Sequence, residues 1–320
     1  MALQPIVASS DGARTTVSDL VKSPRVIPRR MLELTRSQYI VDSVLRAGGD
    51  APGGVVSFYE STPLFLDGSA PGTAAAAVVK PEFGEYRIMT SSEGQQRLVV
   101  SINRGLAIRV SEDMRRRNQI ERVSIQMTQA KNTLTRTWDM AFRDALLLNA
   151  SVPFFNASGT AEGWEAADAD IRRDIMLAKQ MVANSQAGAS TEDFLGFVAD
   201  TMVCSYTTAQ VILGNTKFQD VYHGNLADEN VLYTGKLPNQ IQDLTVLQSR
   251  TWPDNLVWVG ERGTIGFIAN ERPERWTPLR YDEDRETWRS NGSRISAIGI
   301  DQPKAGVFIK NVLGVDGVIG

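Results

Sequence analysis

The feature that most constrains this chain is a long helical pattern over residues 111–149. No proline or glycine occurs between Ser111 and Asn149, and Ser111 is followed by Glu112 and Asp113, which is typical of a helix start. Apolar residues recur at steps of three or four: Ile120, Val123, Met127, Ala130, Leu134, Trp138, Ala141, Ala145 and Leu148. We therefore expect one continuous helix of roughly 55 Å. The average helix has only about 11 residues, and a single apolar stripe on so long a rod predicts one covered face and one polar face.

Such a helix either pairs with a second copy as a coiled coil or runs along a sheet of its own chain. Strand-prone segments on both sides favour the sheet. Val55–Tyr59 is rich in β-branched and aromatic residues, and residues 85–90 and 96–102 flank a short turn that contains Gly94. This pattern predicts a β-hairpin. Because an isolated hairpin is marginal in water, we expect it to lie on another surface, often that of another subunit.

The other segments mix helices and strands. Residues 1–28 are polar, contain three prolines and are expected to form an extended arm. A helix is predicted over 29–45, ending at Gly48-Gly49. Further patterns predict helices over 171–188 and 207–213, strands over 197–204, 246–247, 256–259 and 265–268, and charged strands after Pro273. The predicted fold class is α+β.

Composition excludes several classes of function. The net charge of −3 lacks the basic surplus of a dedicated nucleic-acid binder. Cys204 and His223 are the only residues of their kinds, so an intrachain disulfide and a cysteine-based zinc site are excluded, and a Ser-His-Asp triad could only include His223. The chain has no signal-like start and no apolar stretch of about 18 residues, so we expect a cytosol-like compartment and no membrane span.

One motif imitates a catalytic loop. The segment from His223 to Leu232 resembles the loop of small-molecule kinases in which an Asp base follows His by two residues and an Asn binds magnesium. Asn225 stands at the base position and cannot usefully accept a proton at neutral pH, and no glycine-rich phosphate loop precedes it. A polar loop of turn-forming residues is the simpler interpretation. We likewise interpret Gly260–Gly266 as a turn, Cys204 as a buried structural thiol and Asp282–Glu286 as an exposed turn rather than a metal site.

The predicted elements follow the order arm, short helix, β-hairpin, very long helix, α/β region and terminal strands. Three stretches accompany this order: residues 16–25 (TVSDLVKSPR), 222–238 (YHGNLADENVLYTGKLP) and 297–305 (AIGIDQPKA). Together they resemble the major capsid proteins of tailed bacteriophages, those of actinobacterial phages in particular, with the fold first described for phage HK97. The resemblance spans nearly the whole chain, and none of its stretches is a catalytic signature.

The resemblance implies a structural protein with no enzymatic activity and no cofactor. It implies hexamers and pentamers that close into an icosahedral shell around double-stranded DNA, as part of the virion, after assembly in the cytoplasm of the bacterial host. The implied partners are copies of the chain, a separate scaffolding protein (since no long helical extension is fused at the N-terminus), a portal protein and DNA contacted non-specifically. The resemblance leaves open whether a decoration protein also binds, and no contact with a membrane is expected.

The implied layout has six parts: an N-arm with a short helix (1–52), an E-loop hairpin (53–110), the spine helix of a P-domain (111–159), an A-domain (160–270), P-domain strands (271–299) and a C-terminal strand returning to the A-domain (300–320). The alternative is another phage structural or scaffold protein that assembles through its long helix. A kinase-like transferase around His223 is the third hypothesis.

Charged residues of the arm, the hairpin and the start of the long helix are candidate contacts between subunits: Arg29, Arg30, Lys80, Glu85, Arg87, Arg115, Arg116 and Arg117. The run from Arg115 to Arg117 is usually a solvated helix face, and its functional alternative is contact with a neighbour's acids or with DNA. Some relatives form a Lys–Asn cross-link assisted by a Glu. Aligned on Gln302-Pro303, those positions fall near Glu286 and Ser293, which lack the required chemistry, so we expect no covalent cross-link through Lys80.

Overall fold

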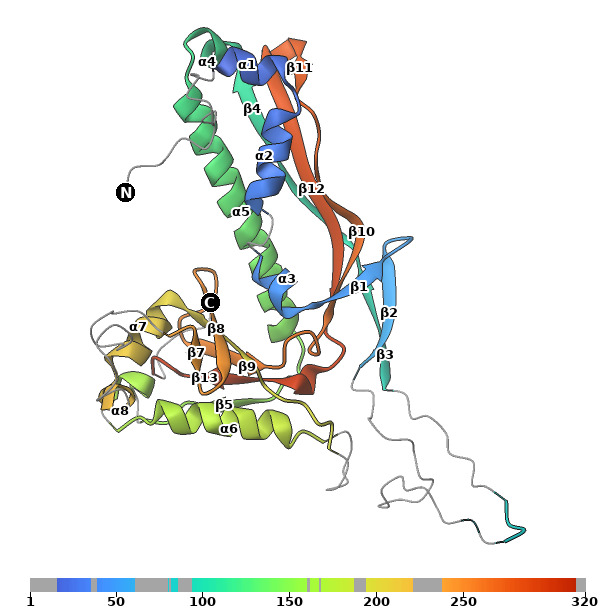
Figure 1. Ribbon diagram of the computed structural model, residues 1–320, viewed down its shortest axis with the longest axis vertical. Helices are drawn as coiled ribbons and strands as arrows, with labels where there is room; N and C mark the ends of the chain where they lie inside the picture. The colour runs from blue at the N-terminus through green and yellow to red at the C-terminus, as the bar shows by residue number, and fades with distance from the viewer. Residues whose placement is uncertain are drawn as a thin grey trace.

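The computed structural model describes residues 16–35, 39–60, 80, 82–85, 94–159, 162–166, 168–186, 194–220 and 238–314. The molecule has a long upright body, a flatter lobe across one end of it, and a two-stranded ribbon that projects beside the body (Figure 1). Three separate sheets correspond to these parts, with five, six and two strands.

The five-stranded sheet of the body is built around one long strand, β12 (Thr287–Gly299). Strand β4 (Ile102–Ser111) pairs antiparallel with β12 over ten residues, from Thr287 opposite Ser111 to Ser296 opposite Ile102. The other neighbours are β10 (Phe267–Trp276) and the short β11 (Arg280–Asp282), and β1 (Arg46–Asp50) adds a parallel strand on β10. The body is thus held together by strands from both halves of the chain.

Helix α5 (Ile120–Leu147) runs along this sheet, with α2 (Val26–Thr35) and α3 (Ile40–Val44) beside it (Figure 1). The predicted stripe is buried at Val123, Met127, Ala130, Leu134 and Trp138. Beyond Trp138 the prediction is wrong, because the buried apolar side chains there are Phe142 and Leu146, and Leu148 is 85% exposed. The expectation of one covered face is confirmed, and the covering surface belongs to the same chain.

The lobe contains a six-stranded sheet in the order β5-β13-β9-β6-β8-β7. Its strands are β5 (Phe154–Asn156), β6 (Thr201–Ser205), β7 (Gln240–Ile241), β8 (Leu244–Ser249), β9 (Leu256–Gly260) and β13 (Gly306–Lys310). Helix α6 (Ile171–Ala183) packs on β13 and β9, while α7 (Tyr206–Gly214) and α8 (Thr216–Asp220) follow β6. Phe142 of α5 contacts the rings of Trp252 and Trp258, so one core continues from the body into the lobe.

The single helix predicted over 111–149 is wrong in one respect. The chain forms α4 (Glu112–Arg116) and then α5, separated at Asn118, whose φ of 48° is left-handed. Asparagine tolerates this conformation better than other residues with a side chain. Its side-chain Oδ1 also accepts a hydrogen bond of 2.9 Å from the Val17 amide. The break therefore ties the start of the long helix to the N-terminal segment.

The N-terminal prediction also needs correction. Instead of an extended arm to residue 28, the described part contains α1 (Val17–Lys22), which begins with a capping box between Thr16 and Asp19. The helix predicted over 29–45 is two helices, α2 and α3, and Gly48-Gly49 lies in β1 rather than at a helix end. Pairing with a strand more than 200 residues away, β10, overrides the local helix-stop signal.

The predicted hairpin has a different partner. The ribbon is formed by β2 (Val55–Glu60) and β3 (Gln95–Val100), so residues 95–100 pair with a strand far upstream; residues 86–93 lie outside the described part. Strand β4, which the predicted layout counted with the hairpin, belongs to the sheet of the body. The strand predicted over 197–204 is β6 at 201–205, whereas the helix predicted over 207–213 is confirmed as α7.

Candidate assembly surfaces

One face of the β2–β3 ribbon packs on its own subunit. The ring of Phe58 meets the ring of Phe267 edge-on, with 5.2 Å between the ring centres. Val56 joins the same small cluster, in which Ala269 of β10 is fully buried. The ribbon is therefore anchored at its foot to the sheet of the body.

The opposite face of the ribbon carries three aliphatic side chains that the described residues leave half exposed or more. Val55 lies directly opposite Val100 in the register, and Leu98 is two positions along on the same face. Their exposed fractions are 49% for Val55, 69% for Leu98 and 61% for Val100. Aliphatic side chains gathered on one exposed face usually mark a contact surface. We call the face formed by these three residues the outer ribbon face.

Helix α4 and strand β11 lie at the far end of the body (Figure 1), and this end carries charges of both signs. Arg115 and Arg116 both form ion pairs with Glu112, and the Arg115 guanidinium lies 5.3 Å from the centre of the Trp288 ring. A shallow cavity of about 290 Å³ opens between them and β11. The acidic stretch from Asp282 to Glu286 begins at the last residue of β11, and residues 283–286 are exposed, as the sequence predicted. The α4 and β11 end of the body can therefore form ion pairs with either acidic or basic groups of another molecule.

A buried network centred on Arg294 holds the N-terminal helices against the body. Its guanidinium donates to both carboxylate oxygens of Asp42, at 2.9 and 2.8 Å, and its Nε donates to Asn270 and Ser296. The same guanidinium lies 5.0 Å from the centre of the Trp138 ring on α5. One side chain thus joins α3, α5 and two strands.

Asp139 on α5 performs a similar task at the start of α3. Its Oδ1 accepts a hydrogen bond of 3.0 Å from the Ile40 amide. Burial removes water from the carboxylate and raises the pKa of Asp139 to about 6, although bonds from the Ile40 and Val41 amides oppose the rise. This carboxylate is therefore committed to the fold.

Comparison with known protein families decides what such a molecule is. The family described as phage capsid protein matches residues 95–309, which run from the start of β3 into β13. The chain belongs to the phage capsid protein family. Membership makes it a structural protein of the viral capsid.

Solved structures share the fold of this capsid protein at low sequence identity. A virus-like particle protein from Pyrococcus furiosus is 12% identical with a TM-score of 0.54, and covers 89% of this chain and 97% of its own. A protein of Mycobacterium phage Che8 is 10% identical with a TM-score of 0.54, covering 98% of both chains. The capsid structure of cyanophage P-SCSP1u is 11% identical with a TM-score of 0.57, covering 85% and 88%. These matches show the HK97-like α+β fold.

No curated protein sequence matches this capsid protein significantly.

The charged residues proposed from sequence do not form one site. Arg29 and Arg30 pair with Glu33 on the exposed side of α2, where water screens the charges and such pairs add little stability. Arg115, Arg116 and Arg117 lie on and just after α4 at the far end of the body. Lys80 and Glu85 are exposed, and Arg87 lies outside the described residues. Their role as contacts stays a prediction.

Other groups singled out in the sequence have plain structural positions. Cys204 is buried in β6, and burial raises the pKa of its thiol to about 12, which agrees with a structural thiol. His223 and Asn225 lie outside the described residues. Within the described part, no group of three His, Cys, Asp or Glu side chains could hold a metal ion, and no helix is long and apolar enough to cross a membrane.

Sequence reasoning missed the outer ribbon face. The alternation of Leu98 and Val100 was visible, but which strand lay opposite was not, because β2 is separated from β3 by 34 residues. It also missed the pair of Arg294 and Asp42, which are 252 positions apart in the chain. Neither has a local signal in the sequence.

Proposed function

We propose that this capsid protein assembles as hexamers and pentamers into an icosahedral shell that encloses double-stranded DNA. The observation that carries the proposal is the two-faced ribbon. Its inner face is packed on its own subunit, and its outer face leaves Val55, Leu98 and Val100 exposed. Full burial of such a side chain stabilises by about 1.5–3 kcal/mol, so covering Leu98 alone contributes about 1–2 kcal/mol per contact. In a closed shell that contact is repeated at every subunit.

The capsid structures that share the fold support the same proposal. One of them is a capsid of an empty GTA particle with C5 symmetry, which covers 86% of this chain at 15% identity. By analogy with such particles, we assign the ribbon the role of an E-loop that lies across an adjacent subunit. The body then corresponds to a P-domain and the lobe to an A-domain, with the N-terminal helices in place of a simple arm.

The alternative, assembly through the long helix, has less support. A coiled coil needs an apolar stripe that is free to pair. On α5 that stripe is covered inside the subunit: Trp138 lies under Arg104 and Arg294, and Phe142 packs on Trp258. Little apolar surface is left on α5 for a second helix.

The other expected partners are a scaffolding protein, a portal protein and DNA contacted without sequence specificity, with assembly in the cytoplasm of the host. The net charge of −3 agrees better with a protein that encloses DNA than with one dedicated to binding it, because a dedicated DNA-binding protein usually has a surplus of basic residues. We also propose that no covalent cross-link joins the subunits. Glu286 stands in the exposed turn after β11, and Ser293 accepts a hydrogen bond of 2.7 Å from Arg272.

Electron microscopy of the full-length protein, expressed with and without a scaffolding protein, tests the proposal. We expect closed shells or rings of five and six subunits for the natural chain. Leu98→Asp combined with Val100→Asp should abolish them, because two charges would have to be buried at each contact.

The matched control is Thr133→Asp, which places a carboxylate on the exposed side of α5 and should leave assembly intact. Circular dichroism should show the same fold in all three proteins. Shells formed by the double variant at the natural yield would contradict the role of the ribbon, and a monomer or dimer of the natural chain under both conditions would contradict the shell itself.

A further inference from the structure

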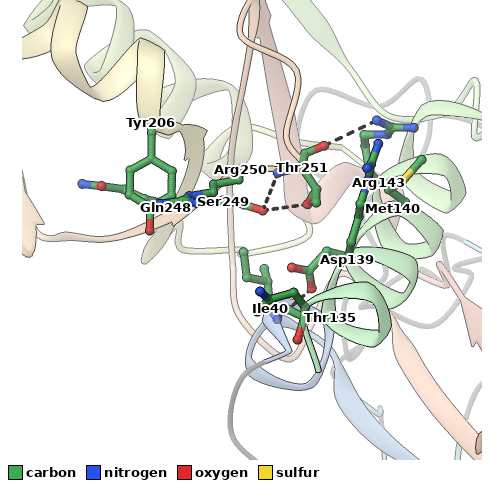
Figure 2. Close-up of a pocket in the computed structure, with 12 residues that line it drawn as sticks. Ile40, Thr135, Asp139, Met140, Arg143, Tyr206, Gln248, Ser249, Arg250 and Thr251 are labelled. Atoms are coloured by element: carbon green, nitrogen blue, oxygen red, sulfur yellow. Dashed lines mark hydrogen bonds between the residues drawn. The ribbon is translucent and has the colours of Figure 1, made fainter. Parts of the chain in front are cut away.

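A polar cleft of about 730 Å³ lies where the body meets the lobe. One wall is the second half of α5, from Asn132 to Arg143, and the other is the end of β8 with the turn to Thr251 and the start of α7 at Tyr206. Figure 2 shows side chains of both walls, with Arg143 of α5 donating a hydrogen bond to the backbone oxygen of Thr251 on the other wall. The cleft is therefore bounded by both parts of the molecule.

The charges that line this cleft are unbalanced. Arg136, Arg143 and Arg250 face a single carboxylate, Asp139. That carboxylate is buried and already accepts the Ile40 amide, so it is poorly placed to neutralise an arginine.

The three arginines differ in how they are held. Arg143 is paired with Asp144 at 2.7 Å, outside the cleft lining. Arg136 and Arg250 form no ion pair with any described residue, and the Arg250 guanidinium lies over the Tyr206 ring at 5.7 Å from its centre. Two arginines, one on each wall, are thus left available.

The rest of the lining supplies neutral polar groups. Thr135 lines the α5 wall, and Gln248, Ser249 and Thr251 line the other. Arginine forks bind carboxylates and phosphates in pairs of parallel hydrogen bonds, so both walls suit an oxyanion. The cleft lies within the range of about 300–1,000 Å³ typical of small-ligand sites, whereas a DNA duplex is bound over a broad surface instead of inside a cleft. Its size favours a few carboxylates on a peptide over a duplex.

We propose that this cleft binds a short acidic peptide segment of a partner protein, with its carboxylates held between Arg136 and Arg250. Such a segment contacts α5 through one arginine and the lobe through the other, and so it bridges the body and the lobe. Resting on the proposed function, we place this partner among the proteins present while the shell assembles.

Fluorescence anisotropy with a fluorescein-labelled octaglutamate peptide tests the site directly. The purified full-length protein should bind the peptide, and Arg136→Gln and Arg250→Gln should each weaken binding by about 10-fold, the loss expected for one charge-assisted hydrogen bond. Arg122→Gln is the control, since Arg122 is an exposed arginine of the same helix outside the cleft. It should bind like the natural chain.

Each contrary result overturns the proposal. Absence of peptide binding does so, and so does an equal loss in the Arg122→Gln control, which would indicate diffuse attraction by net local charge. A short DNA duplex added as competitor should not displace the peptide; displacement that depends on Arg136 would make the cleft a phosphate site. Peptide binding is measured without shell formation, so a protein that does not bind the peptide could still form shells through the outer ribbon face. A protein that forms no shells could likewise still bind the peptide.

Discussion

Replacement of Arg294 by methionine should destabilise the subunit by about 3 kcal/mol. The side chain is only 8% exposed, yet it carries a full charge, so its hydrogen bonds offset a large desolvation cost. Methionine keeps much of the volume and removes the charge, the paired bonds to Asp42 and the stacking on Trp138.

The size of this loss in stability depends on how well water solvates the Asp42 carboxylate once Arg294 is removed. Breaking a buried ion pair costs about 3–5 kcal/mol when the remaining charge stays buried. Here the Asp42 side chain is 40% exposed, so water partly solvates the stranded carboxylate and the lower end applies. Loss of the cation–π contact adds less than about 1 kcal/mol, because Arg104 also lies over the Trp138 ring, at 5.1 Å.

Urea denaturation of unassembled subunits, followed by tryptophan fluorescence, measures the change. Arg294→Lys should recover part of the loss, since it restores the charge without the two-pronged geometry. Arg289→Met is the control: Arg289 is an exposed residue of the same strand whose side chain donates a hydrogen bond to Asn291, and its loss should cost less than about 0.5 kcal/mol. If Arg294→Met falls within the range of this control, the network does not hold α3 to the body.

Two further predictions concern local features of α5. Asp139→Asn should stabilise the subunit progressively as the pH rises, because burial lifts the pKa of Asp139 from 3.8 to about 6. The folded state thus favours the protonated carboxyl, and its advantage, up to about 3 kcal/mol, is lost as the pH rises through 6. Urea midpoints near pH 5 and pH 7.5 measure this, and a difference independent of pH would contradict it. Asn118→Ala should cost about 2 kcal/mol, from left-handed strain and the lost bond to the Val17 amide, and Asn118→Gly about 1 kcal/mol. The opposite order in urea unfolding would show that φ is not the constraint.

Local patterns in the sequence determined several elements of this capsid protein. The spacing of apolar residues from Val123 to Trp138 predicts the covered face of α5, because residues three or four apart lie on the same side of a helix. Beyond Trp138 the buried positions are Phe142 and Leu146 instead of the predicted Ala141, Ala145 and Leu148. The helix after Ser205 and the exposed acidic turn at Asp282–Glu286 follow from equally local signals. The order of these elements was enough to indicate the capsid family.

Only the tertiary structure decided which distant segments meet. The local pattern predicts a helix end at Gly48-Gly49, but these residues form a strand because they pair with β10. The local pattern likewise predicts a helical Asn118, whereas in the fold its side chain accepts a hydrogen bond from the Val17 amide. The outer ribbon face, the Arg294 network and the arginine-lined cleft all join residues from remote parts of the chain. Strand pairing and side-chain contacts of this kind depend on which surfaces the folded chain brings together. Local periodicity predicts the face of each element but not the partner of that face.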